Sequence, residues 1–418
     1  MKILVIGSGA KDHAIAWMFS KSRRISGLYI APGNAGTNKL GTNLPTIGPA
    51  DSSAILSACK EHHIDYIFAG TETPLAAGVV NVLQKAGYPV FGAPKNSLKL
   101  ESDRVFARSF MERHGIPCSS YTMIEDIDSL AAYLKAHPDR RFVIKRNGLA
   151  PSREMLDSAK QEKLLSFASE LLKDSSLFVE EFLKGIPLTI TVLTDGTGGY
   201  LMLPNCSEYT KSETDDRGAA TGGMGAVCPV PILDQDASAL IRDTIVEPTL
   251  AGMEEESLSY KGVFIFSIIL QGGRPVVVDY HVRFNDPATQ ALLPLIRSDF
   301  LDILESVHQG SISRFPLELS DCSTVAVVLA SRGYPQLPET GKPVTSLPYS
   351  LTSSQLLFYG AVENRGNELY TSGGRCFTAV GLSSNIIDAN TEAYALEPEI
   401  EFEGKWFRSD IGNKFFEE

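Results

Sequence analysis

Residues 279–290, with the sequence DYHVRFNDPATQ, follow an apolar run over residues 263–270 and a turn over residues 271–274 that contains Gly-Gly. Two strand-like runs on either side of a two-glycine turn predict a β-hairpin. We expect its second strand to cover residues 276–283 and to end at the Asn-Asp-Pro sequence that follows, because these residue types stop strands and begin turns. The stretch therefore predicts a strand that ends at a polar turn.

Side chains of such a strand alternate between two faces. One face is apolar and can be buried; it carries Val278, Tyr280 and Val282. The other face is polar and carries Asp279, His281 and Arg283. A carboxylate, an imidazole and a guanidinium in a row are suited to hold a metal ion and a polar substrate. The alternative is an ordinary amphipathic edge strand with a solvated ion pair, because polar strand faces are common.

Length and composition exclude some classes of protein. The chain has 418 residues, enough for two to four domains or subdomains, and its net charge of −12 argues against a nucleic-acid partner. No apolar run approaches the length of a membrane span, and the N-terminus begins a strand instead of a signal peptide. The six cysteines are scattered without a CxxC pair, which is typical of reduced thiols. We expect a cytoplasmic monomer or small homo-oligomer that does not contact membranes.

The N-terminal region predicts a βα unit. An apolar strand over residues 2–6 precedes Gly7-Ser8-Gly9 and a helix over residues 10–20 that carries His13 in its first turns. A strand, a glycine turn and a helix N-terminus together can hold an anion with free N–H groups. The third glycine of the dinucleotide fingerprint is missing, so hydride chemistry is not supported. The alternatives are a simple tight βα turn and a helix-capping histidine.

Further strands are expected at residues 28–31, 66–69 and 89–92, with a helix at 76–87. Strands that alternate with helices predict a parallel sheet, and ligands bind at the carboxyl ends of its strands. The loops over residues 32–37 and 70–75, which contain Asn34 and Glu72, follow such ends. We therefore expect these loops and the first glycine turn to form one pocket.

The rest of the sequence indicates a second and a third region. The boundary between the first region and the second is expected near residue 100. Helices are expected at residues 97–114, 158–173, 240–256, 290–306 and 385–397. Strands are expected at residues 142–145, 177–183, 189–194 and 199–203, and residues 147–157 fit no strand pattern. The segment 207–228 is polar and glycine-rich, and we interpret it as a long functional loop. From about residue 323, short strands and the last helix predict a small α+β domain.

Several motifs, in this order along the chain, resemble those of phosphoribosylamine–glycine ligases, the ATP-grasp enzymes of purine synthesis. They are Gly7-Ser8-Gly9 with His13-Ala14, Ala31-Pro32-Gly33-Asn34-Ala35-Gly36-Thr37, Gly70-x-Glu72-x-Pro74-Leu75, Lys145 with Asn147-Gly148-Leu149-Ala150, Glu180-Glu181-Phe182-Leu183, Thr221-Gly222-Gly223-Met224-Gly225-Ala226, and Arg283-Phe284-x-Asp286-Pro287-x-Thr289-Gln290. No single motif is decisive, but their shared order is specific, and the resemblance extends from Ile3 to Ile411.

The resemblance implies an α/β protein with three parts. These are an N-terminal parallel-sheet, Rossmann-like domain over residues 1–100, an ATP-grasp α+β module over 101–320 with a lid at about 118–185, and a small α+β domain over 321–418. It also implies that ATP phosphorylates the carboxylate of glycine and that the amine of 5-phosphoribosylamine attacks the acyl phosphate. Magnesium or manganese would neutralise the phosphates.

Roles for individual residues also follow from the resemblance. The phosphoribosyl group is assigned to Gly9, His13, Asn34 and Glu72, and the glycine end to Thr221, Gly222, Gly223, Met224 and Gly225. Arg283 and Asp286 are the expected catalytic residues. The nucleotide is assigned to Arg104, Lys145, Glu180, Glu181, Leu183 and Lys211, and the metal to Asp279 and His281. The alternatives are a solvated strand-end Lys145, a polar strand terminus at Glu180 and Glu181, and an Asp286 that only forms a turn.

Differences from the family collect on the nucleotide side. Residues 150–155 read Ala-Pro-Ser-Arg-Glu-Met where the family has a glycine–lysine–glycine flap whose N–H groups close over the phosphates. Further differences are Arg104 for lysine, Ile186-Pro187 for a carboxylate, Glu208-Tyr209-Thr210 for Gln-Asp-His, Ala220 for asparagine, Asp279-x-His281 for Glu-x-Asn, and Ala288 for glutamate. Asp279 is a shorter metal ligand than glutamate, and His281 suits zinc or manganese better than magnesium.

These differences leave three hypotheses open. The first is an active phosphoribosylamine–glycine ligase with an unusual flap, in which Arg153 could supply a replacement cation. The second is a catalytically silent relative that binds a phosphoribosyl metabolite without ATP turnover. The third is a ligase that uses another phosphate donor or another amino acid.

Overall fold

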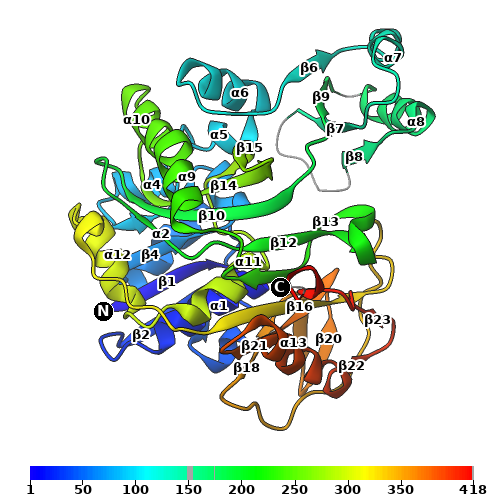
Figure 1. The fold of residues 1–418 in the computed structure, drawn as a ribbon. Coiled ribbons are helices and arrows are strands. Elements are labelled where there is room, and N and C mark those ends of the chain that lie inside the picture. The colour runs from blue at the N-terminus through cyan, green and yellow to red at the C-terminus, as the bar shows by residue number, and fades with distance from the viewer. Residues whose placement is uncertain (148–153, 174, 417–418) are drawn as a thin grey trace.

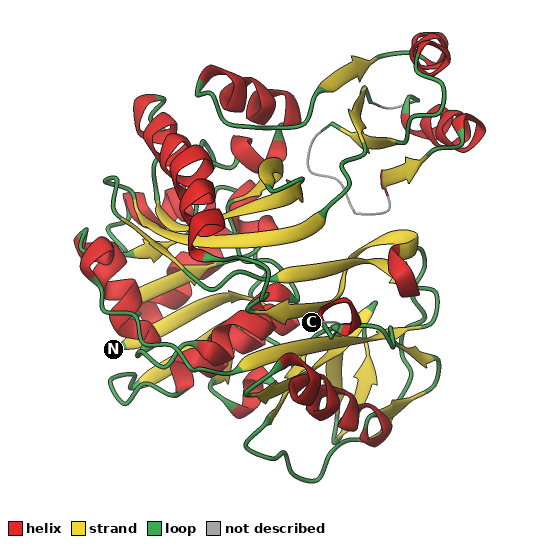
Figure 2. Ribbon diagram, in the orientation of Figure 1, coloured by secondary structure: helices red, strands yellow, loops and turns green. Residues whose placement is uncertain are grey.

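The computed structural model describes residues 1–147, 154–173 and 175–416. Its N-terminal sheet is parallel, in the order β3-β2-β1-β4-β5, and helices cover both faces (Figures 1 and 2). The strands are β1 (Lys2–Gly7), β2 (Gly27–Pro32), β3 (Thr42–Asn43), β4 (Tyr66–Ala69) and β5 (Val90–Phe91). Alternate residues of β1 belong to two cores, one packed with α2 (Ser52–Glu61) and the other with α1 (Ala10–Ser20). The predicted parallel sheet is confirmed.

Two helices predicted as continuous are each broken in two. Residues 76–87 overlap α3 (Glu72–Ala76) and α4 (Val79–Lys85), and between them Gly78 has a φ of +75°, which favours glycine. Residues 97–114 form α5 (Lys99–Ser102) and α6 (Arg104–Arg113). Asp103 is extended at this break, and its side chain accepts the Phe106 N–H at 3.0 Å. Residue-type patterns predicted the helices but missed the cap that begins α6.

The described part of residues 121–181 contains a sheet of order β6-β9-β7-β8 with its own apolar core, set apart at the upper right of Figure 1. Its elements are β6 (Tyr121–Ile124), α7 (Ile127–Ala136), β7 (Phe142–Arg146), β8 (Met155–Ser158), α8 (Gln161–Leu171) and β9 (Leu177–Glu181). The sequence pattern predicted no strand over residues 147–157. This prediction is wrong for residues 155–157, which belong to β8 and pair antiparallel with β7. Residues 148–153 lie outside the described residues; they include Gly148-Leu149-Ala150 of the Lys145 motif and, of the flap differences at 150–155, those up to Arg153.

The central sheet has the order β11-β10-β14-β15. It consists of β10 (Ile186–Asp195), β11 (Tyr200–Met202), β14 (Lys261–Gln271) and β15 (Arg274–His281), and α9 (Gln235–Ile241) and α10 (Glu247–Glu255) precede β14. The predicted hairpin is confirmed: Gly272 and Gly273 have φ values of +58° and +80°, as its turn requires.

The expected alternation along β15 is partly wrong. The register shifts opposite Ser267 and Ile268, which pair with Asp279 and Val277 and leave Val278 as the extra residue of a bulge. Val277 is therefore buried and Val278 is half-buried, the reverse of the prediction for Val278, whereas Tyr280 and Val282 are buried as predicted. The bulge sets the direction of the side chains that follow it in β15. Among them, Asp279, His281 and Arg283 still share one face.

The prediction that residues 207–228 form a long loop is wrong. These residues form a β-hairpin of β12 (Ser207–Glu213) and β13 (Arg217–Cys228). Its glycines permit close packing: a Cβ on Gly225 would lie 2.7 Å from Ile411, and one on Gly223 would lie 2.4 Å from Pro287. The glycine content was therefore a sign of close backbone contact in a strand instead of a loop.

The hairpin continues into the last region through a sheet of order β12-β13-β16-β21-β18, with β23 also paired to β16. This region contains β16 (Ser323–Ser331), β17 (Val344–Ser346), β18 (Gln355–Tyr359), β19 (Val362–Arg365), β20 (Glu368–Thr371), β21 (Arg375–Ser383), α13 (Ile386–Ala395), β22 (Glu401–Phe402) and β23 (Lys405–Trp406). The sheet thus crosses the domain boundary that the sequence placed at residue 320.

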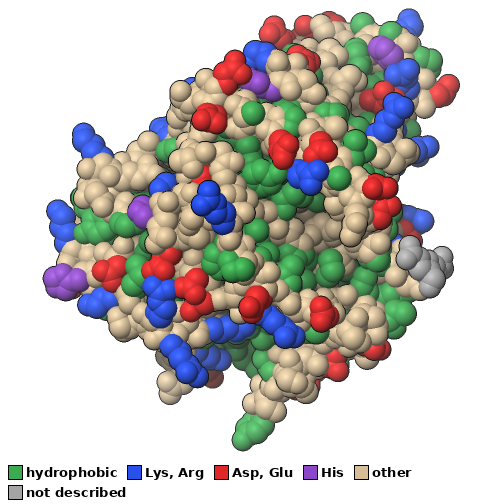
Figure 3. Space-filling view, turned by 60° about the vertical axis from the view of Figure 1, so that its left-hand side comes forward, with side chains coloured by type: hydrophobic (Ala, Val, Ile, Leu, Met, Phe, Trp, Pro, Cys, Tyr) green, Lys and Arg blue, Asp and Glu red, His purple; other side chains and the backbone are tan. Residues whose placement is uncertain are grey.

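The helix predicted over residues 290–306 is also divided, into α11 (Ala288–Leu292) and α12 (Phe300–Gln309), because Ile296 is extended and Asp299 caps a new start. All six cysteines lie among the described residues and are free thiols. Within the described residues, no helix has both the length and the apolar character needed to cross a membrane. Hydrophobic side chains gather across the middle of one face, with charged groups around them (Figure 3).

Candidate functional site

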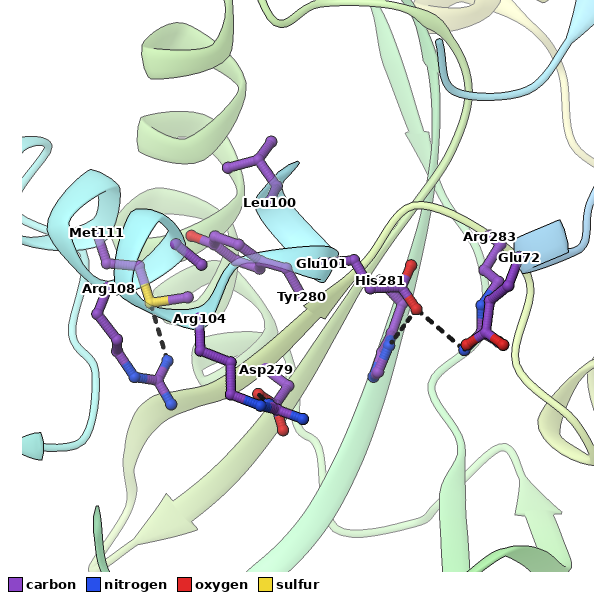
Figure 4. A pocket seen from close by; sticks show the side chains of 11 residues that line it. Glu72, Leu100, Glu101, Arg104, Arg108, Met111, Asp279, Tyr280, His281 and Arg283 are labelled. Atoms are coloured by element: carbon purple, nitrogen blue, oxygen red, sulfur yellow. Dashed lines mark hydrogen bonds and ion pairs between the residues drawn. The ribbon is translucent and has the colours of Figure 1, made fainter. Parts of the chain in front are cut away.

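A pocket of about 90 Å³ lies between α5, α6 and the end of β15 (Figure 4). The residues that line it are Glu72, Leu100, Glu101, Arg104, Ala107, Arg108, Met111, Asp279, Tyr280, His281 and Arg283. The break at Asp103 starts α6 beside β15, so Arg104 and Arg108, four residues apart, extend from one helix face towards it. The polar face of β15 predicted from the sequence therefore faces a helix that carries two guanidinium groups.

Asp279 is bound by two cations at one edge of this pocket. Arg104 Nη1 donates to Asp279 Oδ1, and Lys145 Nζ lies 3.0 Å from Asp279 Oδ2. Burial opposes ionisation of Asp279, but the charges of Arg104 and Lys145 outweigh it and lower the pKa of that carboxyl. Asp279 is therefore an ionised carboxylate with both oxygens in use.

Glu180 of β9 shares Lys145 with Asp279 and is almost fully buried. Lys145 Nζ lies 2.7 Å from Glu180 Oε2, Arg108 Nε donates to Oε1 at 3.1 Å, and Ser119 Oγ donates to the same oxygen. Burial raises the pKa of Glu180, but the charges of Lys145 and Arg108 prevail and lower it. We call Arg104, Arg108, Lys145, Glu180 and Asp279 the Asp279 cluster.

A second group of charges joins β15 to α5 and α3. Arg283 pairs with Glu72 and, at 3.0 Å, with Glu101. Glu101 also accepts the Val282 N–H at 2.9 Å and faces His281 Nδ1 at 3.3 Å. Burial alone would raise the pKa of Glu101, but Arg283 and the bonds from β15 lower it to about 2. Among the described residues, the buried Nε atom of Arg283 has no hydrogen-bond partner, so its N–H is left to bind an anionic ligand.

Arg375, at the start of β21, joins three segments that are far apart in the sequence. Its Nη1 donates to Gly222 O at 2.7 Å, to Asp286 O at 2.8 Å and to Asp286 Oδ1 at 3.1 Å. Gln290 Nε2 donates to the same carboxylate oxygen at 2.8 Å. The glycine-rich motif of β13 and the turn after β15 therefore meet under one guanidinium.

Asn34 fixes the first glycine turn to the C-terminal region. Its Nδ2 donates to Ser8 O at 2.8 Å and to Tyr359 O at 2.7 Å, and its Oδ1 accepts the Gly36 and Thr37 N–H groups. We call Asn34, Gly222, Asp286, Tyr359 and Arg375 the domain seam.

His13 also contacts the C-terminal region. Its Nδ1 accepts the Tyr359 N–H at 2.8 Å, and its ring meets Phe358 edge-on. Burial lowers the pKa of His13 to about 3, so the imidazole is neutral at physiological pH. In this arrangement one ring nitrogen of His13 already has a backbone partner.

An acidic side chain of the protein itself, Asp12, lies at the N-terminus of α1. The carboxylate of Asp12 accepts the Gly9 N–H at 2.9 Å, and burial raises the pKa of Asp12 to about 6. Lys11 is also buried and donates to Phe284 O at 2.9 Å. The amide of Gly9, which the sequence suggested for a phosphate, therefore already faces a carboxylate.

The remaining sequence-predicted residues lie around these groups. Thr221 and Met224 are buried in β13, and Thr221 Oγ1 accepts the Gly223 N–H at 3.0 Å. Lys211 pairs with Asp157 of β8, and the exposed Glu181 pairs with Arg140 at 3.3 Å. Lys211, Glu181 and Leu183 are not among the residues that line the pocket of Figure 4.

The structure tests whether Asp279 and His281 fit a divalent metal ion. Both oxygens of Asp279 already accept from cations, and the two ring nitrogens of His281 face Glu101 at 3.3 Å and Ser267 at 3.2 Å. Among residues 1–147, 154–173 and 175–416, no three His, Cys, Asp or Glu side chains are grouped to hold a metal. As arranged here, these residues do not fit a divalent metal site.

Sequence reasoning missed Glu101, Arg108 and Arg375. The spacing of Arg104 and Arg108 on a helix was a signal that the two share a face. Arg375 follows a Gly-Gly pair that was interpreted only as a turn, and Glu101 stood inside a predicted helix. For these two residues the sequence offered no signal, because their partners are more than 85 residues away for Arg375 and more than 175 for Glu101.

Three family models cover most of the chain. They are the phosphoribosylglycinamide synthetase N domain over residues 1–101, its ATP-grasp (A) domain over 102–289 and its C domain over 324–414. The chain is 35% identical to the phosphoribosylamine–glycine ligase of Chlorobaculum tepidum, over 99% of this chain and 100% of that protein. It is also 35% identical to the trifunctional purine biosynthetic protein adenosine-3 of Drosophila melanogaster, of which it spans 32%.

Solved structures agree with these matches. The crystal structure of phosphoribosylamine–glycine ligase from Thermotoga maritima superposes with a TM-score of 0.84 at 30% identity, covering 98% of this chain and 100% of that chain. Biotin carboxylase from Campylobacter jejuni superposes with a TM-score of 0.72 at 13% identity, covering 97% of this chain and 92% of that chain, and shows a shared fold alone.

Proposed function

The chain belongs to the phosphoribosylglycinamide synthetase family, and from that premise we propose that it is a phosphoribosylamine–glycine ligase of purine biosynthesis. The observation that carries this proposal is the contact between two of the family motifs, residues 221–226 and residues 283–290. Gly223 packs so closely on the turn after β15 that a Cβ would lie 2.7 Å from Asp286 O. Arg375 then binds both segments.

The proposed reaction has two steps. A carboxylate oxygen of glycine attacks the terminal phosphorus of ATP, a P–O bond breaks and ADP leaves. The amine of 5-phosphoribosylamine then attacks the acyl carbon, the C–O bond to phosphate breaks, and the amine loses a proton. Phosphorylation is needed because a carboxylate is a poor acyl donor. ATP supplies the phosphoryl group, and the chain must orient two anionic substrates and exclude water.

We assign the substrate end to the domain seam and Arg283. Gly222 to Gly225 would present backbone groups to glycine, and Arg283 Nε, which has no partner in the described part of the chain, would donate to an oxyanion. Asp286 is held by Arg375 and Gln290, so its carboxylate is fixed for contact with the amine. Gly9, His13, Asn34 and Glu72 remain the proposed phosphoribosyl end, with Glu72 free to exchange its partner because its side chain is half exposed.

We assign the nucleotide end to the Asp279 cluster. Arg104 and Lys145 are the cations that would face the phosphates. Glu180, Glu181, Leu183 and Lys211 remain proposed nucleotide contacts. A cytoplasmic location, and a monomer or small homo-oligomer that binds neither nucleic acid nor membranes, also remain predictions.

The direct test is synthesis of glycinamide ribonucleotide from ATP, glycine and freshly prepared 5-phosphoribosylamine, followed by mass spectrometry and ADP release. We expect product only when all three substrates are present. Asp286→Asn should abolish it, and the exposed control Arg365→Ala should not. Absence of product above the control without enzyme, with binding of glycinamide ribonucleotide retained, would replace this proposal by a silent ligand-binding relative. Product from another amino acid would point to a different ligase.

A further inference from the structure

The Asp279 cluster uses the atoms that a metal ion would need. Each oxygen of Asp279 accepts from a different cation, Arg104 or Lys145. Glu180 Oε2 lies 2.7 Å from Lys145 Nζ, and its Oε1 accepts from Arg108 Nε and Ser119 Oγ. A divalent ion could reach these carboxylates only by displacing the buried Lys145 and Arg108 or the partly exposed Arg104, which is costly.

The neighbouring side chains do not complete a metal site either. Glu101 Oε2 accepts the Val282 N–H at 2.9 Å, and its Oε1 lies 3.0 Å from Arg283 and 3.3 Å from His281 Nδ1. His281 Nε2 faces the Ser267 hydroxyl at 3.2 Å. Each side-chain oxygen and nitrogen of Glu101 and His281 thus has a partner within the protein, and the pairs of Glu101 with His281 and with Arg283 are visible in Figure 4.

The charge balance of the cluster favours an anion. Arg104, Arg108 and Lys145 supply three positive charges, and Glu180 and Asp279 supply two negative charges. Arg104 is partly exposed at the pocket, so its fork of donors can transfer from a carboxylate to a phosphate. Lys145 is buried beside Arg104, and its ammonium group can likewise exchange a carboxylate partner for a phosphate.

We propose that this chain binds the phosphates of a nucleoside di- or triphosphate through Arg104 and Lys145, without a divalent ion held by the protein. Arg104 and Lys145 supply the positive charge that a carboxylate-bound metal supplies in other phosphate sites. Asp279 is a partner that holds these cations in place before the nucleotide arrives, and it competes with the phosphates for them. The choice of a nucleotide as the polyphosphate rests on the proposed function.

The test is calorimetric titration of the full chain with ADP and with a non-hydrolysable ATP analogue, in EDTA and in excess magnesium. We expect the two dissociation constants to agree within about three-fold. Affinity that is higher by about ten-fold or more in magnesium would overturn the proposal, as would absence of binding in both buffers.

Variants sharpen the test. Arg104→Ala should weaken nucleotide binding in EDTA by about ten-fold or more, with Arg104→Lys between it and the wild type. The control Arg113→Ala removes an exposed arginine of the same helix and should change nothing. Asp279→Asn should leave affinity unchanged or raise it, because the competing charge is gone. A ten-fold or greater loss in Asp279→Asn, with thermal unfolding like that of the wild type, would indicate a metal ligand and overturn the proposal.

The outcome is separable from that of the proposed function. Synthesis of glycinamide ribonucleotide together with magnesium-dependent nucleotide binding would leave the function standing and reject this inference. Nucleotide binding in EDTA without any synthesis would support this inference and reject the function.

Discussion

The domain seam and the Asp279 cluster both join distant segments, but they do so with different kinds of partner. In the seam, Asn34 and Arg375 donate to main-chain oxygens of Ser8, Tyr359 and Gly222. In the cluster, the contacts join side chains to one another: two cations, Arg104 and Lys145, pair with two carboxylates, Glu180 and Asp279. Backbone partners are fixed by the fold, whereas paired side chains can change partners when a ligand arrives.

This difference indicates where ligand binding can change the protein. A ligand at the seam meets a surface that is already set by three segments, so binding there requires little rearrangement. A polyphosphate at the cluster exchanges one set of ion pairs for another. We therefore expect seam variants to affect substrate binding and folding together, and cluster variants to separate nucleotide binding from substrate binding.

The largest effect on folding should come from Lys145→Met. Removal of this buried ammonium leaves Glu180 and Asp279 with one cation fewer, at a cost of about 4 kcal/mol in the free energy of unfolding. Urea unfolding measures this cost, and Lys60→Met, on the exposed face of α2, is the matched control. A loss no larger than that of the control would show that the cluster does not contribute to the fold.

Arg375→Met should lower kcat/KM for glycinamide ribonucleotide synthesis by about 100-fold, because Gly222 and Asp286 lose the group that aligns them. Steady-state kinetics with varied glycine measure this, and we expect the affinity for the ATP analogue to stay unchanged. Equal losses in nucleotide and substrate binding would mean that the seam and the cluster are not independent.

Asn34→Ala should lower the free energy of unfolding by about 2 kcal/mol, because it leaves backbone groups of Ser8, Tyr359 and Gly36 without partners. The exposed Asn96→Ala is the control. Thermal and urea unfolding should agree on the order of the variants. An Asn34→Ala protein as stable as the control would contradict a seam held by main-chain contacts.

Glu101→Gln should lower the free energy of unfolding by an amount that depends on pH. The folded pKa of Glu101 is lowered to about 2 from its ordinary value of 4.5, so its contribution is fully present above the ordinary value and is lost as pH falls towards the folded value. The stability difference between wild type and variant should therefore shrink by about 2 kcal/mol between pH 7 and pH 3. A difference that does not change with pH would mean that the pairing with Arg283 does not stabilise the folded chain.

Much of this arrangement could be predicted from the sequence. The parallel N-terminal sheet, the hairpin of β14 and β15, and the shared face of Asp279, His281 and Arg283 followed from periodicity and turn residues. The order of the motifs along the chain was sufficient to identify the ligase family, and the family models that match the chain confirm it.

The parts that could not be predicted depend on contacts distant in sequence. The bulge at Val278 arises from pairing with β14, and period-two alternation cannot reveal it. The segment over residues 207–228 is a hairpin because its glycines pack on Ile411 and Pro287, which lie far along the chain. The metal role expected for Asp279 depended on its oxygens being free, and the cations bound to them come from α6 and β7.

The measurement that tests the two-region account most directly is calorimetric titration of glycinamide ribonucleotide and of an ATP analogue into wild type, Arg104→Ala and Arg375→Met. We predict that Arg104→Ala keeps glycinamide ribonucleotide binding within about three-fold and loses the analogue, and that Arg375→Met shows the reverse. If each variant lost both ligands, or if each lost the ligand assigned to the other region, the division into a substrate seam and a nucleotide cluster would be wrong.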